Sequence, residues 1–234
     1  MGELKAEAIT VGYGSGPAIV RDASVAVSSG TISVLLGPNG AGKSTLMKAL
    51  VGLLAVRSGK VILDGRDVTG MRPFELVRNG VGYLPQLLNV FDELTVHENL
   101  EMGAFTFTGD FHRRVEEVCQ LFPDLPGIFR KRAGKLSGGQ QRMVAMARAL
   151  MVAPQMLTFD EPTAGLSPVY QERVWSQIRT IRDSGVGLLI VEQNATLALR
   201  YADHVYILAD GTNALSGPAD ELRDRDEVAE LLVG

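Results

Sequence analysis

A glycine-rich loop between a strand-like and a helix-like segment constrains the fold of this chain more than any other feature. The loop runs Gly37-Pro-Asn-Gly-Ala-Gly-Lys43-Ser44 and fits the pattern G-x-x-x-x-G-K-S. An apolar, β-branched run precedes it and a helical pattern over 43–53 follows it. Glycines let the backbone curl so that successive N–H groups point at phosphate oxygens, and the helix start adds its positive dipole end. We therefore predict a nucleotide-phosphate site rather than a plain turn, formed by Gly37, Pro38, Asn39, Gly40, Ala41, Gly42, Lys43, Ser44 and Thr45.

Two side chains of this loop carry specific chemistry. The Lys43 ammonium can reach the β- and γ-phosphates of a nucleoside triphosphate, and the Ser44 hydroxyl can coordinate Mg²⁺. We therefore expect Lys43 to take part in catalysis and Ser44 to be a metal ligand.

Strand-like and helix-like segments alternate along most of the remaining chain. Short apolar runs at 60–63, 81–84, 156–159, 187–191 and 205–208 are typical of strands, and helical patterns occur over 168–183 and from 194. This alternation predicts an α/β fold, a P-loop NTPase core with a mainly parallel sheet covered by helices. The length of 234 residues, with 46% hydrophobic and 21% charged residues, fits one globular domain of this kind.

Two regions depart from the alternation. The first thirty residues contain β-like segments and glycines, which favours an antiparallel β region at the edge of the core. Residues 95–150 carry no strong strand pattern, and the stretch 111–122 is an amphipathic helix. We expect a helical lobe inserted into one domain, with residues 1–86 and 152–234 as the α/β core and 87–151 as the helical subdomain.

Composition excludes several classes of protein. The net charge of −4 gives no overall positive field that would attract nucleic acid. The single cysteine, Cys119, excludes an intrachain disulfide and a cysteine-rich zinc site. Apolar runs are far shorter than the ~20 residues of a membrane helix, and the N-terminus lacks the apolar core of a signal peptide. We expect a cytoplasmic protein that reaches a membrane only through a partner.

A pair of acids, Asp160 and Glu161, follows the apolar run 156–159. In doubly wound sheets the carboxyl ends of central parallel strands lie beside the ligand site. Asp160 would then bind Mg²⁺ directly or through its ligands, while Glu161 would face the γ-phosphate and polarise an attacking water. The alternative is a solvated strand end whose acids cap the next helix. Together with the phosphate loop, the pair favours an ATPase that uses ATP and Mg²⁺.

The segment Leu136-Ser-Gly-Gly-Gln140 narrows the choice among ATPase families. Its serine and glycines offer hydroxyl and N–H donors at the start of a helix over 140–151, which makes a second anion site. Between the phosphate loop and the acid pair, this LSGGQ string resembles the signature of ABC ATPases. The resemblance covers almost the whole chain and implies the ABC ATPase fold. It also implies that two subunits bind ATP head to tail, with the phosphate loop of one facing Ser137, Gly138, Gly139 and Gln140 of the other.

The resemblance assigns two further residues to the ATP site. Tyr13 matches the family's aromatic residue that stacks on adenine, although a turn tyrosine is the alternative. Gln86 matches the glutamine that touches Mg²⁺ and water and links the helical lobe to the core, so the expected metal set is Ser44, Gln86 and Asp160. The family also implies transmembrane permease subunits as partners, which would hold the chain at the inner face of the cell membrane.

Two positions differ from the family pattern. The histidine that most members place against the γ-phosphate is Gln193 here, whose amide can hydrogen-bond but cannot carry a positive charge. Loss of one preorganised donor costs about 2.7–4 kcal/mol, so we expect slower turnover with Gln193 as a partial substitute. The usual aspartate after the acid pair is Ser167, which puts communication between the two sites in doubt. Importer subgroups of the family resemble this chain at both positions, and their ATPase subunits often pair with a different ATPase. We therefore expect a heterodimer rather than a homodimer.

Within the family, the chain looks most like ATPases of branched-chain amino-acid importers and their urea or amide relatives. The resembling segments are 81–86, 89–100, 160–168 and 190–194. This implies an ATP-hydrolysing subunit that powers solute import. The alternative is a weakly hydrolysing or non-transport regulatory ATPase, which the glutamine and serine departures keep open. A DNA-repair ATPase would need a long insertion between Lys43 and Ser137, where fewer than one hundred residues lie.

Overall fold

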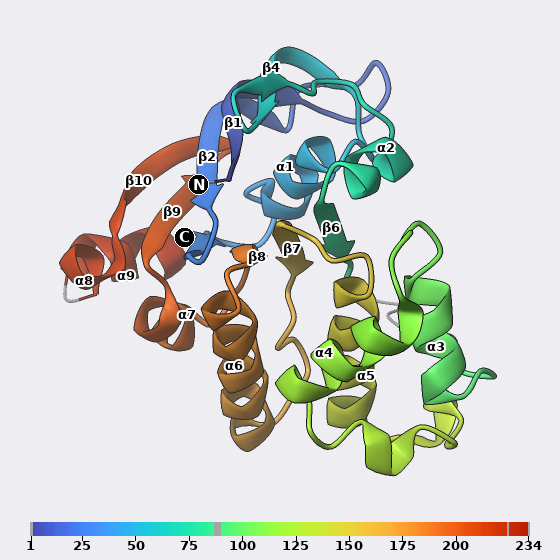
Figure 1. Cartoon of the computed structure of the whole chain (residues 1–234). Helices are drawn as coiled ribbons and strands as arrows, with labels where there is room; N and C mark the ends of the chain where they lie inside the picture. The colour runs from blue at the N-terminus through green and yellow to red at the C-terminus, as the bar shows by residue number, and fades with distance from the viewer. Residues whose placement is uncertain (1, 87–89, 224, 234) are drawn as a thin grey trace.

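The computed structural model describes residues 2–86, 90–223 and 225–233, and its strands form two sheets (Figure 1). The larger sheet has the strand order β10-β9-β3-β8-β7-β6, in which every neighbouring pair is parallel except β10 with β9. The predicted α/β fold with a mainly parallel sheet is therefore confirmed. The strands are β3 (Ile32–Leu36), β6 (Val81–Leu84), β7 (Met156–Asp160), β8 (Gly187–Val191), β9 (His204–Ala209) and β10 (Thr212–Pro218).

The smaller sheet is antiparallel, with the order β2-β1-β4-β5. Its strands are β1 (Glu3–Val11), β2 (Val20–Ser28), β4 (Val56–Leu63) and β5 (Arg66–Asp67). The first thirty residues thus form the expected antiparallel region. The apolar run 60–63 does not join the parallel sheet, because it is the end of β4 and pairs with β1. Most of β4 before Val61 is exposed, whereas strands of parallel sheets are buried on both faces.

The helices cover the larger sheet and form a separate group beyond β6. Their bounds are α1 (Lys43–Leu50), α2 (Pro73–Arg78), α3 (Val96–Gly103), α4 (Phe111–Leu121), α5 (Gly138–Leu150), α6 (Pro168–Asp183), α7 (Ala195–Tyr201), α8 (Ala219–Leu222) and α9 (Asp226–Val233). Two short 3-10 turns, η1 (Pro126–Ile128) and η2 (Ala133–Lys135), lie between α4 and α5. None of the helices in the described ranges is both long and apolar enough to span a membrane.

One helix is shorter than the sequence pattern predicts. The structure ends α1 at Leu50 rather than at residue 53. Gly52 has a φ of 71°, and a Cβ at this position would lie 2.3 Å from the carbonyl oxygen of Met71. The chain therefore turns where a neighbouring segment approaches the backbone, and only glycine fits there without strain.

The segment between β6 and β7 is helical, as expected. Within its described part, residues 90–151, the chain forms no strand, although Thr95 and Arg132 make an isolated antiparallel bridge. The amphipathic stretch 111–122 forms α4, which Asp110 caps by accepting hydrogen bonds from the backbone N–H groups of His112 and Arg113. Figure 1 shows α3, α4 and α5 gathered on the side of the molecule away from the antiparallel sheet.

The three central strands β3, β7 and β8 are buried on both faces and separate two hydrophobic clusters. On one side, Leu35 and Leu189 pack with α1 and the antiparallel sheet. On the other side, Leu157 and Leu188 pack with α5 and α6. Because alternate residues of a strand point to opposite faces, continuous apolar runs are needed here, and they are what the sequence contains.

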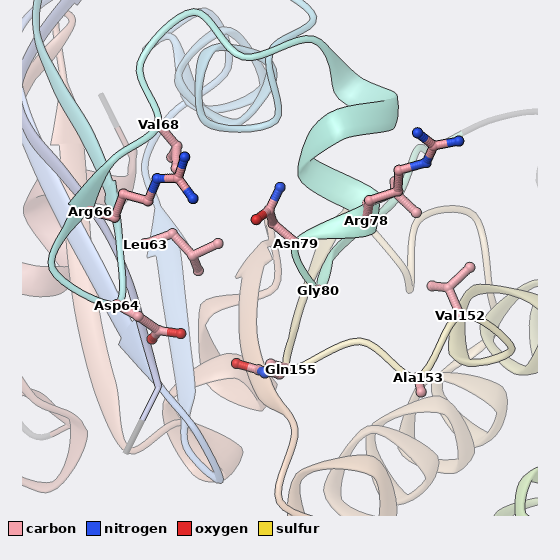
Figure 2. Close-up of a pocket in the computed structure, with 11 residues that line it drawn as sticks. Leu63, Asp64, Arg66, Val68, Arg78, Asn79, Gly80, Val152, Ala153 and Gln155 are labelled. Carbon is pink, nitrogen blue, oxygen red and sulfur yellow. The ribbon is translucent and has the colours of Figure 1, made fainter. Parts of the chain in front are cut away.

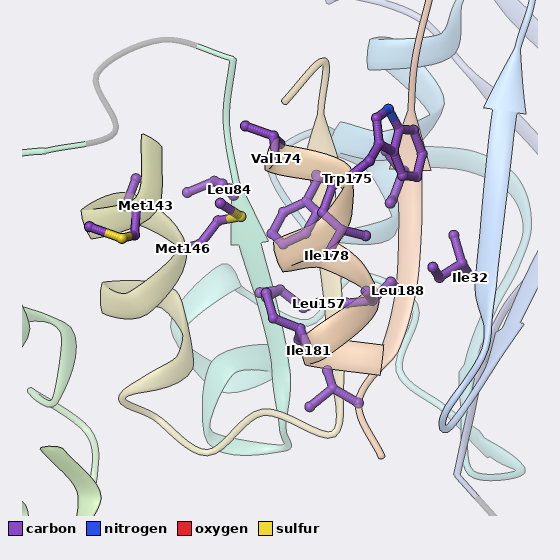
Figure 3. Packing of buried hydrophobic residues seen from close by; sticks show 14 of the residues in the cluster. Ile32, Leu84, Met143, Met146, Leu157, Val174, Trp175, Ile178, Ile181 and Leu188 are labelled. Atoms are coloured by element: carbon purple, nitrogen blue, oxygen red, sulfur yellow. The ribbon is translucent and has the colours of Figure 1, made fainter. Parts of the chain in front are cut away.

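Trp175 of α6 is the largest of the completely buried side chains in the second cluster. Figure 3 shows it with Ile178 and Ile181 on the helix face that packs toward Leu157 and Leu188. Its ring stacks on Tyr201 of α7 with 5.3 Å between ring centroids and 6° between the planes. Within the described residues, its Nε1–H group has no hydrogen-bond acceptor. The residue therefore stabilises the fold through packing alone.

We expect Trp175→Ala to lower the free energy of unfolding by about 3–5 kcal/mol, because it leaves a large cavity between α6 and the sheet. Trp175→Phe should cost clearly less, because it keeps a ring and removes an unpaired buried donor. Urea unfolding measures both values. Val169→Ala, at a position 78% exposed on the same helix, is the control. Equal losses for the two Trp175 variants would contradict this account.

Candidate functional site

The glycine-rich loop joins β3 to α1 at the carboxyl edge of the larger sheet. Gly37 has a φ of 146°, and a Cβ there would lie 2.1 Å from the carbonyl oxygen of Leu208. Gly42 has a φ of 98° and occupies the N-cap position of α1. Both positions therefore require glycine, and the loop brings the positive end of α1 to the strand edge. The predicted strand–loop–helix arrangement of the phosphate site is present.

The Lys43 side chain is folded into this loop. Its Nζ donates hydrogen bonds to the carbonyl oxygens of Gly37 at 2.7 Å and Pro38 at 2.9 Å. Burial lowers the pKa of Lys43, while the charges of Glu161 and Asp160 raise it. A partly desolvated cation thus lies within the loop, which suits the binding of phosphate oxygens.

Ser44 and Asp160 come together from α1 and the end of β7. The Ser44 hydroxyl donates to Oδ1 of Asp160 at 2.9 Å, and the carboxylate is buried. Burial raises the pKa of Asp160, and the bond from Ser44 opposes that shift. Adjacent hydroxyl and carboxylate oxygens are ligands that suit Mg²⁺, which usually takes one or two carboxylates and completes its shell with water and phosphate. Within the described residues no cluster of three or more His, Cys, Asp or Glu could hold a metal by itself.

Glu161 is held between two side-chain amides. Nε2 of Gln86 donates to Oε2 of Glu161 at 2.6 Å, and Nε2 of Gln193 donates to Oε1 at 2.7 Å. The backbone N–H of Glu161 donates to the carbonyl oxygen of Val191 at 2.9 Å, and its φ is 49°. A non-glycine residue in the left-handed region is uncommon and often marks a functional position. The carboxylate is therefore fixed in direction as well as in place.

The contacts predicted for the two glutamines involve groups other than Glu161 and stay predictions. The resemblance implies Mg²⁺ and water for Gln86 and the γ-phosphate or attacking water for Gln193, whereas in the structure both bond to Glu161. They are nevertheless gathered with Lys43 and the Ser44–Asp160 pair at one edge of the sheet. A cleft of about 260 Å³ over the loop is lined by Ile19, Asn39, Gly40, Gly42, Lys43, Ser44, Thr45 and Glu161.

Two predicted regions stand apart from this cleft. Tyr13 lies in the turn after β1, is 50% exposed and is not among the described residues that line the cleft. Ser137 caps α5: its hydroxyl accepts from the backbone N–H of Gln140, whose side chain accepts from the N–H of Ser137. Ser137 and Gly139 line a different cleft, of about 390 Å³, with Tyr170 of α6. One chain thus does not bring its signature segment onto its own phosphate loop.

A cleft larger than the one over the phosphate loop lies elsewhere. It measures about 520 Å³ and lies between the β4–β5 turn, the end of α2 and the segment before β7 (Figure 2). Gly80 and Gln155 in its lining precede the amino ends of β6 and β7, whereas ligands of parallel sheets bind at carboxyl ends. None of the predicted site residues lines it. Size alone therefore does not identify the site.

Sequence reasoning missed Tyr83 and Ile19. Burial raises the pKa of Tyr83 to about 12, and the neighbouring Asp160 adds to the shift. Its strand β6 pairs in parallel with β7, so an aromatic residue near the end of that run could have been placed beside the acid pair. Ile19 lies just before β2, and nothing in its local sequence indicates that it reaches the phosphate loop.

Comparison with known proteins agrees with this geometry. The model of the ABC transporter family matches residues 20–164. A probable branched-chain amino acid transport ATP-binding protein, LivF of Archaeoglobus fulgidus, is 39% identical over 218 residues, which cover 92% of each chain. The high-affinity branched-chain amino acid transport ATP-binding protein BraG of Pseudomonas aeruginosa is 37% identical over 232 residues, or 99% of each chain.

Other similar proteins differ in their named cargo. The lipopolysaccharide export system ATP-binding protein LptB of Escherichia coli is 33% identical over 238 residues, covering 100% of this chain and 98% of LptB. Among solved structures, the ADP conformation of an ATP-binding cassette of an ABC transporter has a TM-score of 0.90 and 28% identity, and the match covers 100% of this chain and 99% of that one.

The chain therefore belongs to the ABC transporter family. It has the ABC ATPase fold and is a nucleotide-binding subunit that hydrolyses ATP for transport, as the LSGGQ resemblance implied.

We expect Lys43→Ala to abolish measurable ATP binding, because it removes the cation from the phosphate loop and leaves the N–H groups alone to hold a highly charged ligand. Equilibrium binding of a fluorescent ATP analogue measures the loss. Lys60→Ala removes an exposed lysine from β4 and is the matched control. Full binding by Lys43→Ala would overturn the assignment of the loop.

Proposed function

We propose that this chain hydrolyses ATP at an interface between two ATPase subunits and powers a membrane importer of the branched-chain amino-acid type. The observation that supports hydrolysis best is the Glu161 carboxylate, clamped between two amides beside Lys43 and the Ser44–Asp160 pair. The importer class rests on the 39% and 37% identity to LivF and BraG over nearly the whole chain. In this proposal the solute is a branched-chain amino acid or a related amide.

Each group has a distinct task in the proposed reaction. Lys43 and the loop N–H groups hold the β- and γ-phosphates in line for attack. Ser44 and Asp160 would hold Mg²⁺, with Gln86 nearby, and the ion would neutralise charge that develops on the transferred phosphoryl group. Glu161 orients the attacking water and draws its proton, and Gln193 steadies that carboxylate. A neutral amide in place of a cation gives a slower site, as the sequence predicts.

The second subunit follows from the position of the signature segment. Ser137 and Gly138 are exposed at the start of α5 and lie outside the phosphate cleft of their own chain. A partner arranged head to tail would bring this helix start to the γ-phosphate, where N–H donors and the dipole favour negative charge. Because Ser167 stands where the family places an aspartate, we propose a different ATPase as this partner. Tyr13 would then stack on adenine from the turn after β1.

A surface on the helical segment suits a permease. The groove between β6, α3 and α5 has a volume of about 240 Å³, and its lining includes Leu84, Phe91 and Met102. Phe91 is 45% and Met102 is 49% exposed, and Phe105, which follows α3, is 87% exposed. Exposed apolar side chains around a groove typically mark a protein interface. We propose that residues 87–151, the helical subdomain, receive a short permease helix there and so hold the chain at the inner face of the cell membrane.

The bond of Gln86 to Glu161 links this groove to catalysis in the proposed scheme. Gln86 leaves β6 at the edge of the groove and bonds to Glu161, while Asn99 of α3 holds the backbone of Phe91 through its N–H at 2.8 Å and its carbonyl oxygen at 3.1 Å. A permease helix in this groove would contact Leu84 at the end of β6, two residues before Gln86.

Two other functions have support of their own. The identity of 33% to LptB fits a subunit of a lipopolysaccharide-type export system. The uncharged Gln193 fits a regulatory ATPase with little turnover, because a neutral amide stabilises developing charge less than a cation does. Phosphate release measured with and without permease subunits distinguishes a regulatory ATPase from a transport ATPase. Uptake of leucine, isoleucine or valine into vesicles separates import from export.

We expect Glu161→Gln to bind ATP with nearly unchanged affinity but to hydrolyse it at least about a hundredfold more slowly, because the water loses its base. Steady-state phosphate release and ATP binding measure the two effects. Glu230→Gln, an exposed acid of α9, is the control. Near-normal turnover of Glu161→Gln would remove this residue from its proposed role.

We expect Met102→Glu to retain the ATPase rate of the free subunit but to lose stimulation by permease subunits, since a charge in the groove opposes burial of an apolar helix. Co-purification with the permease subunits of the same transporter, followed by ATPase assay in vesicles, measures this. Glu101→Gln on the exposed face of α3 serves as the control. Full stimulation of Met102→Glu would argue against the groove as the docking site.

A further inference from the structure

A buried acid lies directly behind the proposed catalytic group. Glu192 follows β8, is 2% exposed and accepts three hydrogen bonds. Its Oε1 accepts from the backbone N–H of Thr163 at 3.1 Å and from the Thr163 hydroxyl at 2.7 Å. Its Oε2 accepts from the backbone N–H of Gln193 at 3.1 Å. Burial of an acid to this degree is unfavourable unless its oxygens accept hydrogen bonds, and here three donors meet that need.

The three donors belong to the two loops that carry the catalytic side chains. Thr163 lies two residues after Glu161, in the turn that follows β7. Gln193 is the residue whose amide bonds to Glu161. Glu192, which directly precedes Gln193, therefore ties the loop of the carboxylate to the loop of its amide partner.

The signature helix joins the same network. Arg142 of α5 donates from Nη1 to the backbone carbonyl oxygen of Gln86 at 3.2 Å. Burial lowers the pKa of Arg142, and the charge of Glu192 raises it. A continuous path thus leads from Glu192 through Arg142 and Gln86 to Glu161, and returns through Gln193. Each link is a hydrogen bond except the electrostatic one between Glu192 and Arg142.

We propose that Glu192 is a positioning residue for ATP hydrolysis, which fixes the backbone at Thr163 and Gln193 and so holds the Gln193 amide against the carboxylate of Glu161. This inference rests on the catalytic role proposed for Glu161. Glu192 touches neither water nor phosphate in this scheme and acts only through its neighbours. A small displacement of a catalytic group lowers the rate strongly while substrate binding persists, because only the transition state requires the full geometry.

Glu192→Gln is the sharpest test, because it keeps size and shape but replaces one acceptor oxygen with an NH₂ donor. Whichever way the amide is turned, that donor faces either the Gln193 N–H or the Thr163 donors, and one link is lost. We expect kcat for ATP hydrolysis to fall about tenfold or more, with KM for ATP within about twofold, which is the pattern of a lost transition-state contact. Steady-state phosphate release over a range of ATP concentrations measures both values.

A double-mutant cycle separates positioning from a general structural effect. If Glu192 acts through Gln193, the variant carrying Glu192→Gln and Gln193→Ala should be no slower than Gln193→Ala alone, within about twofold. Independent damage to the fold would instead multiply the two losses. Glu172→Gln makes the same chemical change on α6, where the acid bonds to Arg200 and Tyr201, and should leave kcat unchanged. Thermal unfolding of each variant reports stability.

Each result has a definite meaning. An unchanged kcat in Glu192→Gln, a rise in KM alone, or multiplied losses in the double variant would overturn the inference. If Glu192→Gln does not fold, Thr163→Val removes one of the three donors with little change in shape, and an unchanged kcat there would overturn it as well. If Glu161→Gln slows hydrolysis while Glu192→Gln does not, only this inference fails. If Glu161→Gln hydrolyses normally, the proposed function fails first.

Discussion

The site depends on the register of three parallel strands, which end at the same level in the sheet. Leu35 of β3 and Asp160 of β7 both pair with Val191 of β8, so the three strands end side by side. The chain leaves each strand at the same edge and delivers the phosphate loop, the acid pair and the segment with Gln193 to one place. The hydrophobic clusters on both faces fix that alignment, because a slip of one residue would turn each strand's side chains to the opposite cluster. Packing far from the nucleotide thus sets the geometry of the chemistry.

Charge is concentrated where the sheet has removed most of the water. Lys43, Asp160, Glu161 and Glu192 are all buried. Isolated charges in such surroundings are strongly unfavourable, and each of these four has hydrogen-bond partners that offset part of the cost. Asp160 and Glu161 lie beside the phosphate loop, where a bound triphosphate would add its own negative charge to theirs. This accumulation of negative charge gives a physical reason for Mg²⁺ to accompany the nucleotide.

The sequence predicted the elements better than their connections. Continuous apolar runs identified β3, β7 and β8, since strands buried on both faces leave a pattern that short windows reveal. The run at 60–63 is a strand, as predicted, but the sequence did not show that it pairs in the antiparallel sheet, because strand pairing depends on residues distant in the chain. The catalytic segments were found from motifs, but the bonds of Gln86 and Gln193 to Glu161 were not. Those bonds join residues 75 and 32 positions apart and depend on side-chain rotamers that no local pattern encodes. The role of Tyr13 stays a prediction.

The reciprocal bonds at the start of α5 have a consequence for how two subunits would part. In the free chain, Ser137 and Gln140 already satisfy each other's N–H groups, so this helix end is stable in water without a ligand. A phosphate that arrives from a neighbour exchanges one set of hydrogen bonds for another instead of adding new ones, and the net gain is small. The closed arrangement of the two subunits would then be weakly stabilised and would open easily. An ATPase must release its product and return to the open state in every cycle. A helix start that is stable without a ligand makes that return easier.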